Sequence, residues 1–577
     1  MRRFQSLIHR FGRDERGAFA MIFAIMAIVL VAMSGAVVDF TSMQQSRTKA
    51  QVALDAAALA LQPTIYTDSA SKLQTEAQAL LVNRLADATT TWKDCGASGH
   101  DNPPPCVHVA TPVLDTSAGS LTFSADITVP MNFVSLVGVN TLTAQIESVA
   151  TRQKLNLEVA LVLDNSGSMS TSFGGWRSTR LSVLKDSANC AANILYYGVT
   201  GCGSSVAGLT KNDSVSMALV PFNDEVNVGA TYALAHSWLD RTGASGSYAN
   251  DNFAKDNSDT AATSVDRIAL FNKMKDSSGN PLQWRGCVEA RIEDGVSKNY
   301  DTDDTPPQPG FPETYFVPLF APDEPDTVVY SRPKYSNSYI PDNPTGTNQC
   351  SGTKPTAERT LQERLCKYNG ATPSSSVLGP NADCPVSAIQ PLTTDPATIT
   401  SAINSMVANG NTNIQEGTAW GFRVLSPGEP FTEGRPYDQA TSKVMIIMTD
   451  GENTYSADSS MNGASLYTSY GYPWDNYKSG TTGYRGRMGN KGWGDSDFET
   501  EINRRLSITC TNAKAQGITI YTIGLATDQT SDPTGNTTLL TNCASKPQDA
   551  YFPQTSGDLQ QAFVDIANQL AALRLAK

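Results

Sequence analysis

Leu157 to Met169 read LEVALVLDNSGSM, a run of mostly apolar, β-capable residues that ends in an acid and two hydroxyl residues. Such a run predicts a strand of a parallel sheet, because parallel strands are buried on both faces. Asp164, Ser166 and Ser168 follow where the strand ends, which is where open α/β sheets bind their ligands. One carboxylate and two hydroxyls are hard oxygen ligands for an ion such as Mg²⁺, so further ligands are expected from distant loops.

Two later segments offer those ligands. Residues 409–414, NGNTNI, place Thr412 in a Gly/Asn-rich turn before an amphipathic stretch, and residues 443–451, KVMIIMTDG, form a second buried-strand pattern that ends at Asp450. Each motif alone is also explained by a helix cap or a turn. The three motifs in this order favour a metal site over a degenerate site without metal.

The pattern D-x-S-x-S, then a loop Thr, then a strand with TDG resembles the von Willebrand factor A domain and its metal-ion-dependent adhesion site. The resemblance implies an α/β fold with a doubly wound, mostly parallel sheet. It implies Mg²⁺, or Mn²⁺ or Ca²⁺, as the ion, with an acidic residue of a partner protein completing the coordination. The implied metal ligands are Asp164, Ser166 and Ser168 from the first loop, Thr412 from the second and Asp450 from the third.

Composition narrows the class of protein. With 577 residues, more than one domain is expected, and 40% hydrophobic with 17% charged residues is typical of a folded chain. The net charge of −13, without a Lys/Arg cluster beyond the first sixteen residues, argues against nucleic-acid binding.

The ten cysteines all lie at or beyond residue 95, and no two form a C-x-x-C. With only four histidines this pattern favours disulfides in an oxidising compartment over a zinc site. Four cysteines of the middle region allow three connectivities, of which we prefer the nested one, and the alternative is that some are free buried thiols. The expected pairs are Cys95–Cys106, Cys190–Cys202, Cys510–Cys543, Cys350–Cys366 and Cys287–Cys384.

Residues 18–38 carry no charge, and 21 residues of helix span a bilayer core of about 30 Å. Five arginines precede this stretch, so the positive-inside rule places residues 1–17 in the cytoplasm and the chain from Asp39 outside it. A cleaved signal peptide is the alternative, and the length of the apolar run favours an uncleaved transmembrane helix.

Periodicity divides the rest of the chain. In residues 39–154, the stretch 41–62 is predicted to extend the membrane helix outward and 69–88 to form another helix. Alternating strands follow, which is the order of a small pilin-like α+β unit. Residues 155–577 alternate between strands and helices, as a parallel sheet requires. The expected strands are 157–163, 214–222 with 226–228 as an edge partner, 443–448, 517–524 and 550–552, and the expected helices are 181–195, 396–407, 414–425, 499–516 and 556–573.

Two long insertions interrupt this α/β pattern. Residues 236–391 are too many for an ordinary loop and are expected to be functional or separately folded. Residues 455–498 are rich in Tyr, Gly and Trp, which is equally consistent with an exposed recognition surface and with an inert loop.

A second resemblance covers nearly the whole chain. The basic N-terminus ending in Arg16-Gly17, the single apolar helix and the segments RGCVEAR (285–291), Cys384-Pro385 and EGTAWGFR (416–423) are similar to the TadG-like proteins of the bacterial tight-adherence (Flp) pilus assembly systems. The resemblance implies a single-pass inner-membrane protein with its bulk in the periplasm or facing the surface. Its implied partners are proteins, either other pilus-assembly components or a surface ligand.

The sequence lacks a Walker A motif, H-E-x-x-H, a dinucleotide fingerprint and G-x-S-x-G, so we predict a non-enzyme without a small-molecule substrate. Two functions remain open. In the first, an accessory assembly protein binds a partner's carboxylate through the metal. In the second, the chain is a minor pilin-like structural subunit, or a surface adhesin, whose metal site is only structural.

Overall fold

The structure is a computed structural model that forms two compact units, 1–154 with 575–577, and 155–574. It describes residues 15–576 except for 66–67, 88–89, 97–101, 116–118, 152–155, 173–177, 244–249, 251, 256–257, 262–263, 276–278, 292–298, 324–341, 343–349, 351, 354, 369–378, 382, 439, 457–465, 473–487, 489–493 and 526–534. Most of the predicted cytoplasmic tail, 1–14, and parts of both predicted insertions therefore lie outside the described residues.

The first unit is built on one long helix, α2 (Glu15–Leu61), which confirms that the helix over 41–62 extends the apolar helix over 18–38. Side chains of its first half, such as Phe23 and Leu30, are exposed, whereas Met43 and Leu54 of its second half are buried. In the described part of the chain, one helical segment is long and apolar enough to cross a membrane, and it runs from Ile22 to Leu61.

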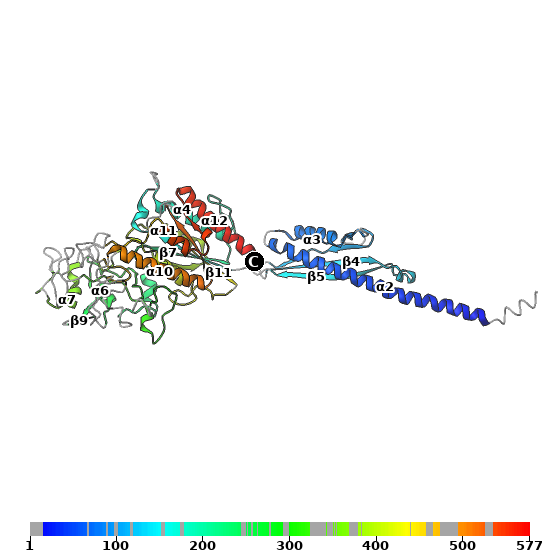
Figure 1. The fold of residues 1–577 in the computed structure, drawn as a ribbon, viewed down its shortest axis with the longest axis horizontal. Helices are drawn as coiled ribbons and strands as arrows, with labels where there is room; N and C mark the ends of the chain where they lie inside the picture. Colours follow the sequence, from blue (N-terminus) through cyan, green and yellow to red (C-terminus); the bar gives the residue numbers. More distant parts are fainter. Residues whose placement is uncertain are drawn as a thin grey trace, which may run out of the picture. The chain divides into compact units, whose positions relative to one another are not determined.

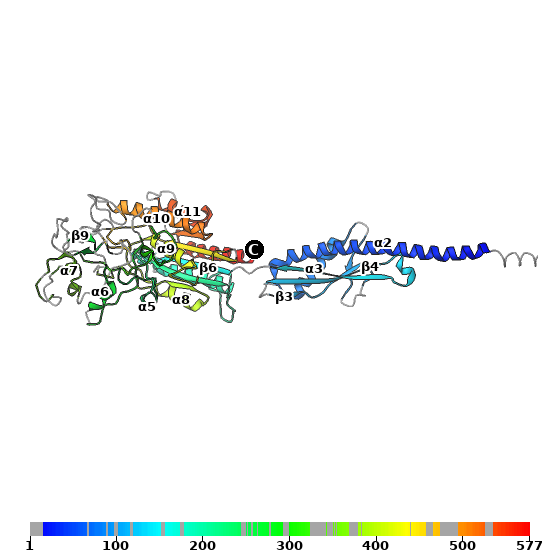
Figure 2. The same ribbon diagram turned by 90° about the horizontal axis from the view of Figure 1, so that it is seen from below.

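The second half of α2 packs on a mostly antiparallel sheet (Figures 1 and 2). The central strand β4 (Ser120–Pro130) pairs along one edge with β5 (Thr141–Thr151). Its other edge carries β2 (Cys106–Val109) and β3 (Val113–Asp115), and β1 (Lys93–Asp94) pairs with β2. Alternate residues of β4 are buried, as the sequence predicted, and they share a core with α2 and with α3 (Ala70–Leu85). The short turns η1 (Gln62–Thr64) and η2 (Val134–Val137) follow α2 and β4.

The second unit contains a six-stranded sheet in the order β10-β7-β6-β11-β12-β13. All neighbouring strands are parallel except β10, which runs antiparallel to β7. The central pair, β6 and β11, aligns Leu163 with Met448, so both strands end at the same edge of the sheet. The strands are β6 (Asn156–Asp164), β7 (Val215–Phe222), β10 (Gln390–Thr393), β11 (Thr441–Thr449), β12 (Thr519–Gly524) and β13 (Ala550–Tyr551).

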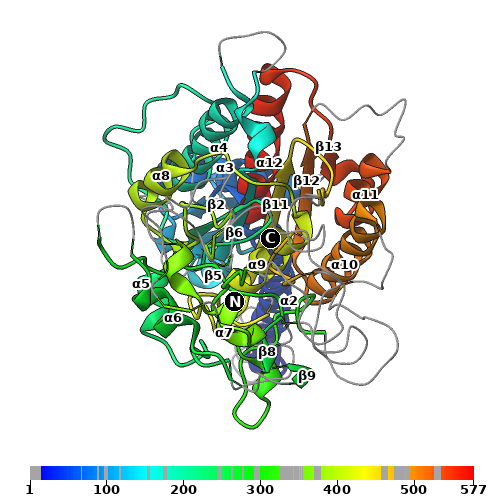
Figure 3. The same ribbon diagram turned by 90° about the vertical axis from the view of Figure 1, so that its left-hand side faces the viewer.

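Helices cover both faces of this sheet, so the central strands are apolar on both sides (Figure 3). Val159 and Leu161 face the core formed with α4 (Arg180–Tyr197), α8 (Pro396–Ser405) and α12 (Ser556–Ala576). Ala160 and Val162 face the core formed with α9 (Ile414–Leu425) and α10 (Asp495–Ala515). The predicted mixed α/β architecture is therefore confirmed.

Two details differ from the prediction. The antiparallel edge partner of β7 is β10, whereas Asn227 of the expected strand 226–228 forms bridges with Cys287 and Ala388. Residues 536–543 also form a helix that was not predicted, α11 (Asn536–Cys543), which packs on α10 and β12. Both elements are short, and their pairing comes from tertiary contacts that no local periodicity reports.

The described part of the first insertion belongs to the main core and does not fold separately. It contains only short elements. The ring of Trp238 packs against that of Phe316, with centroids 5.7 Å apart. Phe316 packs in turn against Trp420 of α9, with centroids 5.0 Å apart, so the insertion shares the core of the sheet. The helix α5 (Ala230–Leu234) comes just before the insertion. The elements within it are β8 (Ala254–Lys255), β9 (Ser258–Ala261), α6 (Arg267–Lys273), η5 (Pro312–Thr314), α7 (Glu358–Gln362) and η6 (Leu365–Tyr368).

The aromatic side chains described in the second insertion are not an exposed surface. Tyr455, Tyr467, Tyr470 and Tyr472 are all buried, and Tyr455 packs against Phe498 of α10. Of the two alternatives left open for this insertion, an exposed aromatic surface does not apply to these four residues, because they pack over α10 and the first insertion.

All ten cysteines are paired, and the five disulfides are those predicted, the preferred nested pair included. Cys510–Cys543 ties α10 to α11, and Cys287–Cys384 joins two distant parts of the first insertion.

Candidate metal centre

The first predicted ligand, Asp164, is the last residue of β6 and is fully buried. The apolar run before it is held between two helical layers, which fixes the position of this carboxylate at the sheet edge. Its Oδ1 accepts the backbone N–H of Ser166 at 2.8 Å, and its Oδ2 accepts the hydroxyl of Thr449 at 2.7 Å.

Asp450 reaches the same place because β11 lies beside β6 and ends in register with it. Ser168 donates its hydroxyl to Oδ1 of Asp450 at 2.7 Å, and the hydroxyls of Ser166 and Ser168 are 3.0 Å apart. The structure therefore brings together Asp164, Ser166, Ser168 and Asp450 through direct hydrogen bonds.

Thr412 lies on a loop that is bonded to the first loop. Gly167 donates its N–H to the carbonyl of Gly410 at 2.9 Å, and Asn409 donates to the carbonyl of Asn165 at 2.8 Å. Thr412 itself is 4% exposed. The loop needs glycine at 410, where φ is +76° and a Cβ would lie 2.5 Å from the side chain of Asn223.

The carboxylates of Asp164 and Asp450 repel each other when both are ionised. Burial, together with the nearby charge of Asp450, raises the pKa of Asp164 to about 7. A bound divalent cation would relieve both effects, and the donor set of carboxylate and hydroxyl oxygens is one that Mg²⁺ prefers. The five predicted residues therefore fit a metal of this class.

Sequence reasoning missed Arg180, the first residue of α4. Its Nη1 lies 2.7 Å from Oδ2 of Asp450, whose side chain is fully buried, while the side chain of Arg180 keeps 27% of its surface exposed. Arg180 thus supplies a positive charge to the same acid that a metal would use. Thr449 was also missed as a hydrogen-bond donor to Asp164, although it stands in the TDG motif. No local signal pairs residues 270 positions apart.

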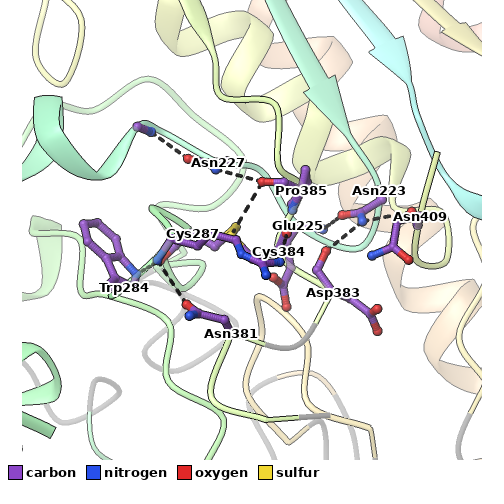
Figure 4. Close-up of a disulfide and its surroundings, with 12 residues drawn as sticks. Asn223, Glu225, Asn227, Trp284, Cys287, Asn381, Asp383, Cys384, Pro385 and Asn409 are labelled. Carbon is purple, nitrogen blue, oxygen red and sulfur yellow. Dashed lines mark hydrogen bonds between the residues drawn. A yellow bond between two sulfur atoms is a disulfide. The ribbon is translucent and has the colours of Figure 1, made fainter. Parts of the chain in front are cut away.

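The Cys287–Cys384 disulfide lies in a segment that is bonded to the residue after β7, Asn223 (Figure 4). Beyond the end of β7, Asn223 donates its side-chain amide to the carbonyls of Asp383 at 2.7 Å and Asn409 at 3.0 Å. Asn223 therefore connects the disulfide-linked segment with the loop that carries Thr412.

Acidic groups also gather at the end of β7. Burial, with the charge of Asp383 as the second cause, raises the pKa of Asp224 to about 8 and that of Glu225 well above its usual range. Asp224 accepts the side-chain amide of Asn411, the neighbour of Thr412, at 3.2 Å. The candidate centre therefore lies in a strongly acidic part of the sheet edge.

Residues 17–62 match the sequence family Tad, described as "Putative Flp pilus-assembly TadE/G-like". No curated protein matches the sequence. Among solved structures, the chain has some likeness to the pilus adhesin SpaC from Lactobacillus rhamnosus GG, with 12% identity, a TM-score of 0.29, and coverage of 82% of this chain and 35% of that one. The chain thus spans about a third of the length of SpaC.

Two further structures show a similar degree of likeness. The vWF domain of the type V pili tip protein Mfa5 from Porphyromonas gingivalis has 12% identity and a TM-score of 0.30, over 73% of this chain and 96% of that one. The adhesive tip pilin GBS104 from Group B Streptococcus agalactiae has 11% identity and a TM-score of 0.27, over 72% and 99%. At these TM-scores the likeness carries no argument about fold or function. The similarity to the family described as "Putative Flp pilus-assembly TadE/G-like" concerns residues 17–62, the segment that contains most of α2.

Proposed function

We propose that this chain is a membrane-anchored accessory protein of tight-adherence (Flp-type) pilus assembly that binds a protein partner through a metal-ion-dependent adhesion site. One observation carries the proposal: Asp164, Ser166, Ser168 and Asp450 are hydrogen-bonded together at one sheet edge, next to the loop of Thr412. The TadE/G-like segment supports the pilus context.

The fold that we propose for residues 155–577 is that of a von Willebrand A domain with two insertions. Its support is a doubly covered, mostly parallel sheet whose central strands β6 and β11 end in the two acids. In such a sheet the ligand binds beyond the carboxyl ends of the strands.

In this proposal, Asp164, Ser166, Ser168, Thr412 and Asp450 hold Mg²⁺, or Mn²⁺ or Ca²⁺, and a partner's Asp or Glu completes the coordination. A binding role rather than hydrolysis is supported by the two histidines that the structure describes. His108 pairs with Asp94 in the first unit, and His236 is bonded to the carbonyl of Tyr232. Both histidines therefore have polar partners other than the five predicted metal ligands.

The anchor in this proposal is the apolar first half of α2, with the N-terminus in the cytoplasm and the rest of the chain in the periplasm or at the surface. The helix from Ile22 to Leu61, which is long and apolar enough to cross a membrane, supports it. Five disulfides support an oxidising location for the remainder.

Manganese binding to the detergent-solubilised full chain tests the metal site. Free Mn²⁺ has a six-line electron paramagnetic resonance signal that is lost on binding, so we expect one strong site in the natural chain and none in Asp164→Asn or Ser168→Ala. Asp126→Asn, a change of an exposed acid on β4, is the matched control and should bind normally. Equal binding by Asp164→Asn would refute the proposed site.

The second candidate function is a minor pilin-like structural subunit, which the packing of α2 on a mostly antiparallel sheet favours. Capture of pilus-assembly components by the tagged chain separates the two candidates. Binding that requires Mg²⁺ and is lost with EDTA or in Asp164→Asn supports the metal-dependent role. Pilus assembly that is unaffected by Asp164→Asn supports the structural role.

A further inference from the structure

The loop between β4 and β5 is fastened to α2 at two neighbouring points. The carboxylate of Asp39 accepts the backbone N–H groups of Asn132, Phe133 and Val134 at 3.2, 2.8 and 2.8 Å. One helical turn earlier, Phe133 lies so close to Gly35 that a Cβ there would be 2.3 Å from the Cβ of Phe133. These contacts fix the position of the loop along the axis of α2, at the level of Gly35 and Asp39.

That level lies inside the proposed membrane span. Gly35 comes four residues before Asp39, which is about 6 Å along a helix. If residues 18–38 cross the bilayer core, the contact between Phe133 and Gly35 lies at the level of the last turn of the span. This step rests on the membrane anchor of the proposed function.

The loop presents apolar side chains at this level. Phe133, Val139 and Leu142 keep 38%, 44% and 38% of their surface exposed. At the same level of α2, on faces of the helix that do not contact the loop, Val37 and Phe40 are exposed by 63% and 57%. Single exposed apolar residues need no explanation, but a patch continuous with a membrane span does.

The backbone of the loop is also suited to an apolar environment, where unpaired N–H groups are costly. Besides the three N–H groups on Asp39, the loop bonds to itself. Met131 donates to the carbonyl of Asn140 at 2.9 Å, Gly138 to that of Ser135 at 3.0 Å, and Val139 to that of Val134 at 3.3 Å. The buried carboxylate of Asp39 is paired by the same contacts.

We propose that residues 131–142 form a second membrane-contacting element, which lies in the outer interface of the bilayer that α2 crosses. The loop and α2 then meet the membrane together, so the first unit is seated on the bilayer surface and not held away from it. An apolar element of this kind adds binding through its buried area.

Single cysteines test the proposal well, because all ten natural cysteines are in disulfides. An environment-sensitive fluorophore is attached to the full chain in vesicles of phosphatidylethanolamine and phosphatidylglycerol. Phe133→Cys and Val139→Cys report on the loop, and Val139 is not part of the Gly35 contact. Val29→Cys, 52% exposed, reports on the span. The matched control is Val113→Cys on β3, 68% exposed and about 30 Å along β4 from the loop.

We expect blue-shifted emission, quenching by doxyl-labelled lipid and protection from iodide at residues 133, 139 and 29, and none of these at residue 113. A probe at 29 in lipid with probes at 133 and 139 in water would overturn the loop proposal while the anchor stands. All four probes in water would overturn both. Loop probes that are shielded from iodide and from the lipid quencher alike would mean a protein contact, such as a second copy of the chain, and would also overturn the proposal.

Discussion

At the scale of single residues, Arg180 and a metal ion at the candidate centre would compete for the carboxylate of Asp450. In the structure Arg180 contacts one oxygen of this carboxylate and Ser168 the other. A metal that uses Asp450 must displace Arg180 or share the acid with it. Arg180 thereby lowers the affinity of the proposed site, and its partial exposure gives it room to move away.

Arg180→Gln should therefore strengthen Mg²⁺ binding. An ion pair with a partly exposed partner is worth up to about 1 kcal/mol, which corresponds to about a fivefold change in affinity. Competition of Mg²⁺ with Mn²⁺ in the resonance experiment measures it. Arg435→Gln, which removes a partly exposed partner of the buried Glu158, should leave the affinity unchanged. Weaker Mg²⁺ binding by Arg180→Gln would show that Arg180 supports the site.

The stability of the second unit should fall as pH rises, because several of its carboxyl groups are buried. Burial raises the pKa of Glu416 from its ordinary 4.5 to about 7, although Arg423 and a hydrogen bond from Trp420 partly oppose this. Between these two values Glu416 stays protonated in the folded state and is ionised in the unfolded state. The unfolded state then binds fewer protons, so the free energy of unfolding decreases across this range by up to about 3 kcal/mol.

Glu416→Gln keeps an oxygen for Trp420 and removes the titration. We expect a smaller loss of stability between pH 5 and pH 8, measured in urea by the fluorescence of the buried tryptophans. Glu433→Gln, an exposed change, should keep the pH dependence of the natural chain. The same loss of stability in both variants would mean that Glu416 is ionised in the folded protein.

At the scale of elements, the close packing of α9 on the sheet depends on a glycine. A Cβ at Gly421 would lie 2.4 Å from Cγ2 of Val162 and 3.1 Å from the sulfur of Met445. Replacing a helical glycine with alanine usually stabilises a helix by up to about 1 kcal/mol, but overpacking costs about 1–3 kcal/mol. Because of the clash with two central strands, the net effect of a Cβ at residue 421 on stability is expected to be a loss.

Gly421→Ala is expected to lower the melting temperature of the second unit. Gly557→Ala in the first turn of α12 is the control, because its nearest atom is an ordinary contact at 3.8 Å. That change should be neutral or slightly stabilising. A higher melting temperature for Gly421→Ala would show that α9 can move away from β6 and β11.

The elements also show what the sequence can predict. The strands around 157–164 and 443–448 and helix 414–425 have clear apolar patterns, and the structure contains all three. Gln390–Thr393 has four residues and a proline, so only its pairing with β7 makes it a strand. Similarly, the buried state of Tyr470 depends on α10 and on the first insertion, which no local pattern reports.

The residues of the candidate metal centre also divide into those with a local sequence signal and those that depend on tertiary contacts. Asp164, Ser166, Ser168, Thr412 and Asp450 could be selected because they stand in short motifs at strand ends and in one turn. Arg180 could not, because a lone arginine in the first turn of a helix has no signature and its contact is made across the sheet edge. The acidic surroundings at Asp224 and Glu225 also depend on residues brought from far along the chain, such as Asp383.

At the scale of the whole molecule, the arginines before the apolar helix predict the orientation in the membrane. A reporter that is fluorescent only in the cytoplasm should be silent when fused after Lys577 and active when fused before Met1. Both fusions are made to the full chain, so each controls for the expression of the other. Fluorescence from the C-terminal fusion would reverse the orientation and remove the oxidising environment that the disulfides need.

The continuity of α2 has a mechanical consequence. Its 47 residues extend about 70 Å and include no proline. At Gly35, the one glycine near the middle, the side chain of Phe133 occupies the space that a Cβ would take. There is thus no hinge between the apolar half of this helix and the half that forms the core of the first unit. If the apolar half crosses the bilayer, as we propose, a sideways load on that unit would act on the helix as on a lever and tilt it in the membrane. A load along the helix axis would be resisted by the bilayer itself, as a pull against the anchor, and no slack segment would absorb it.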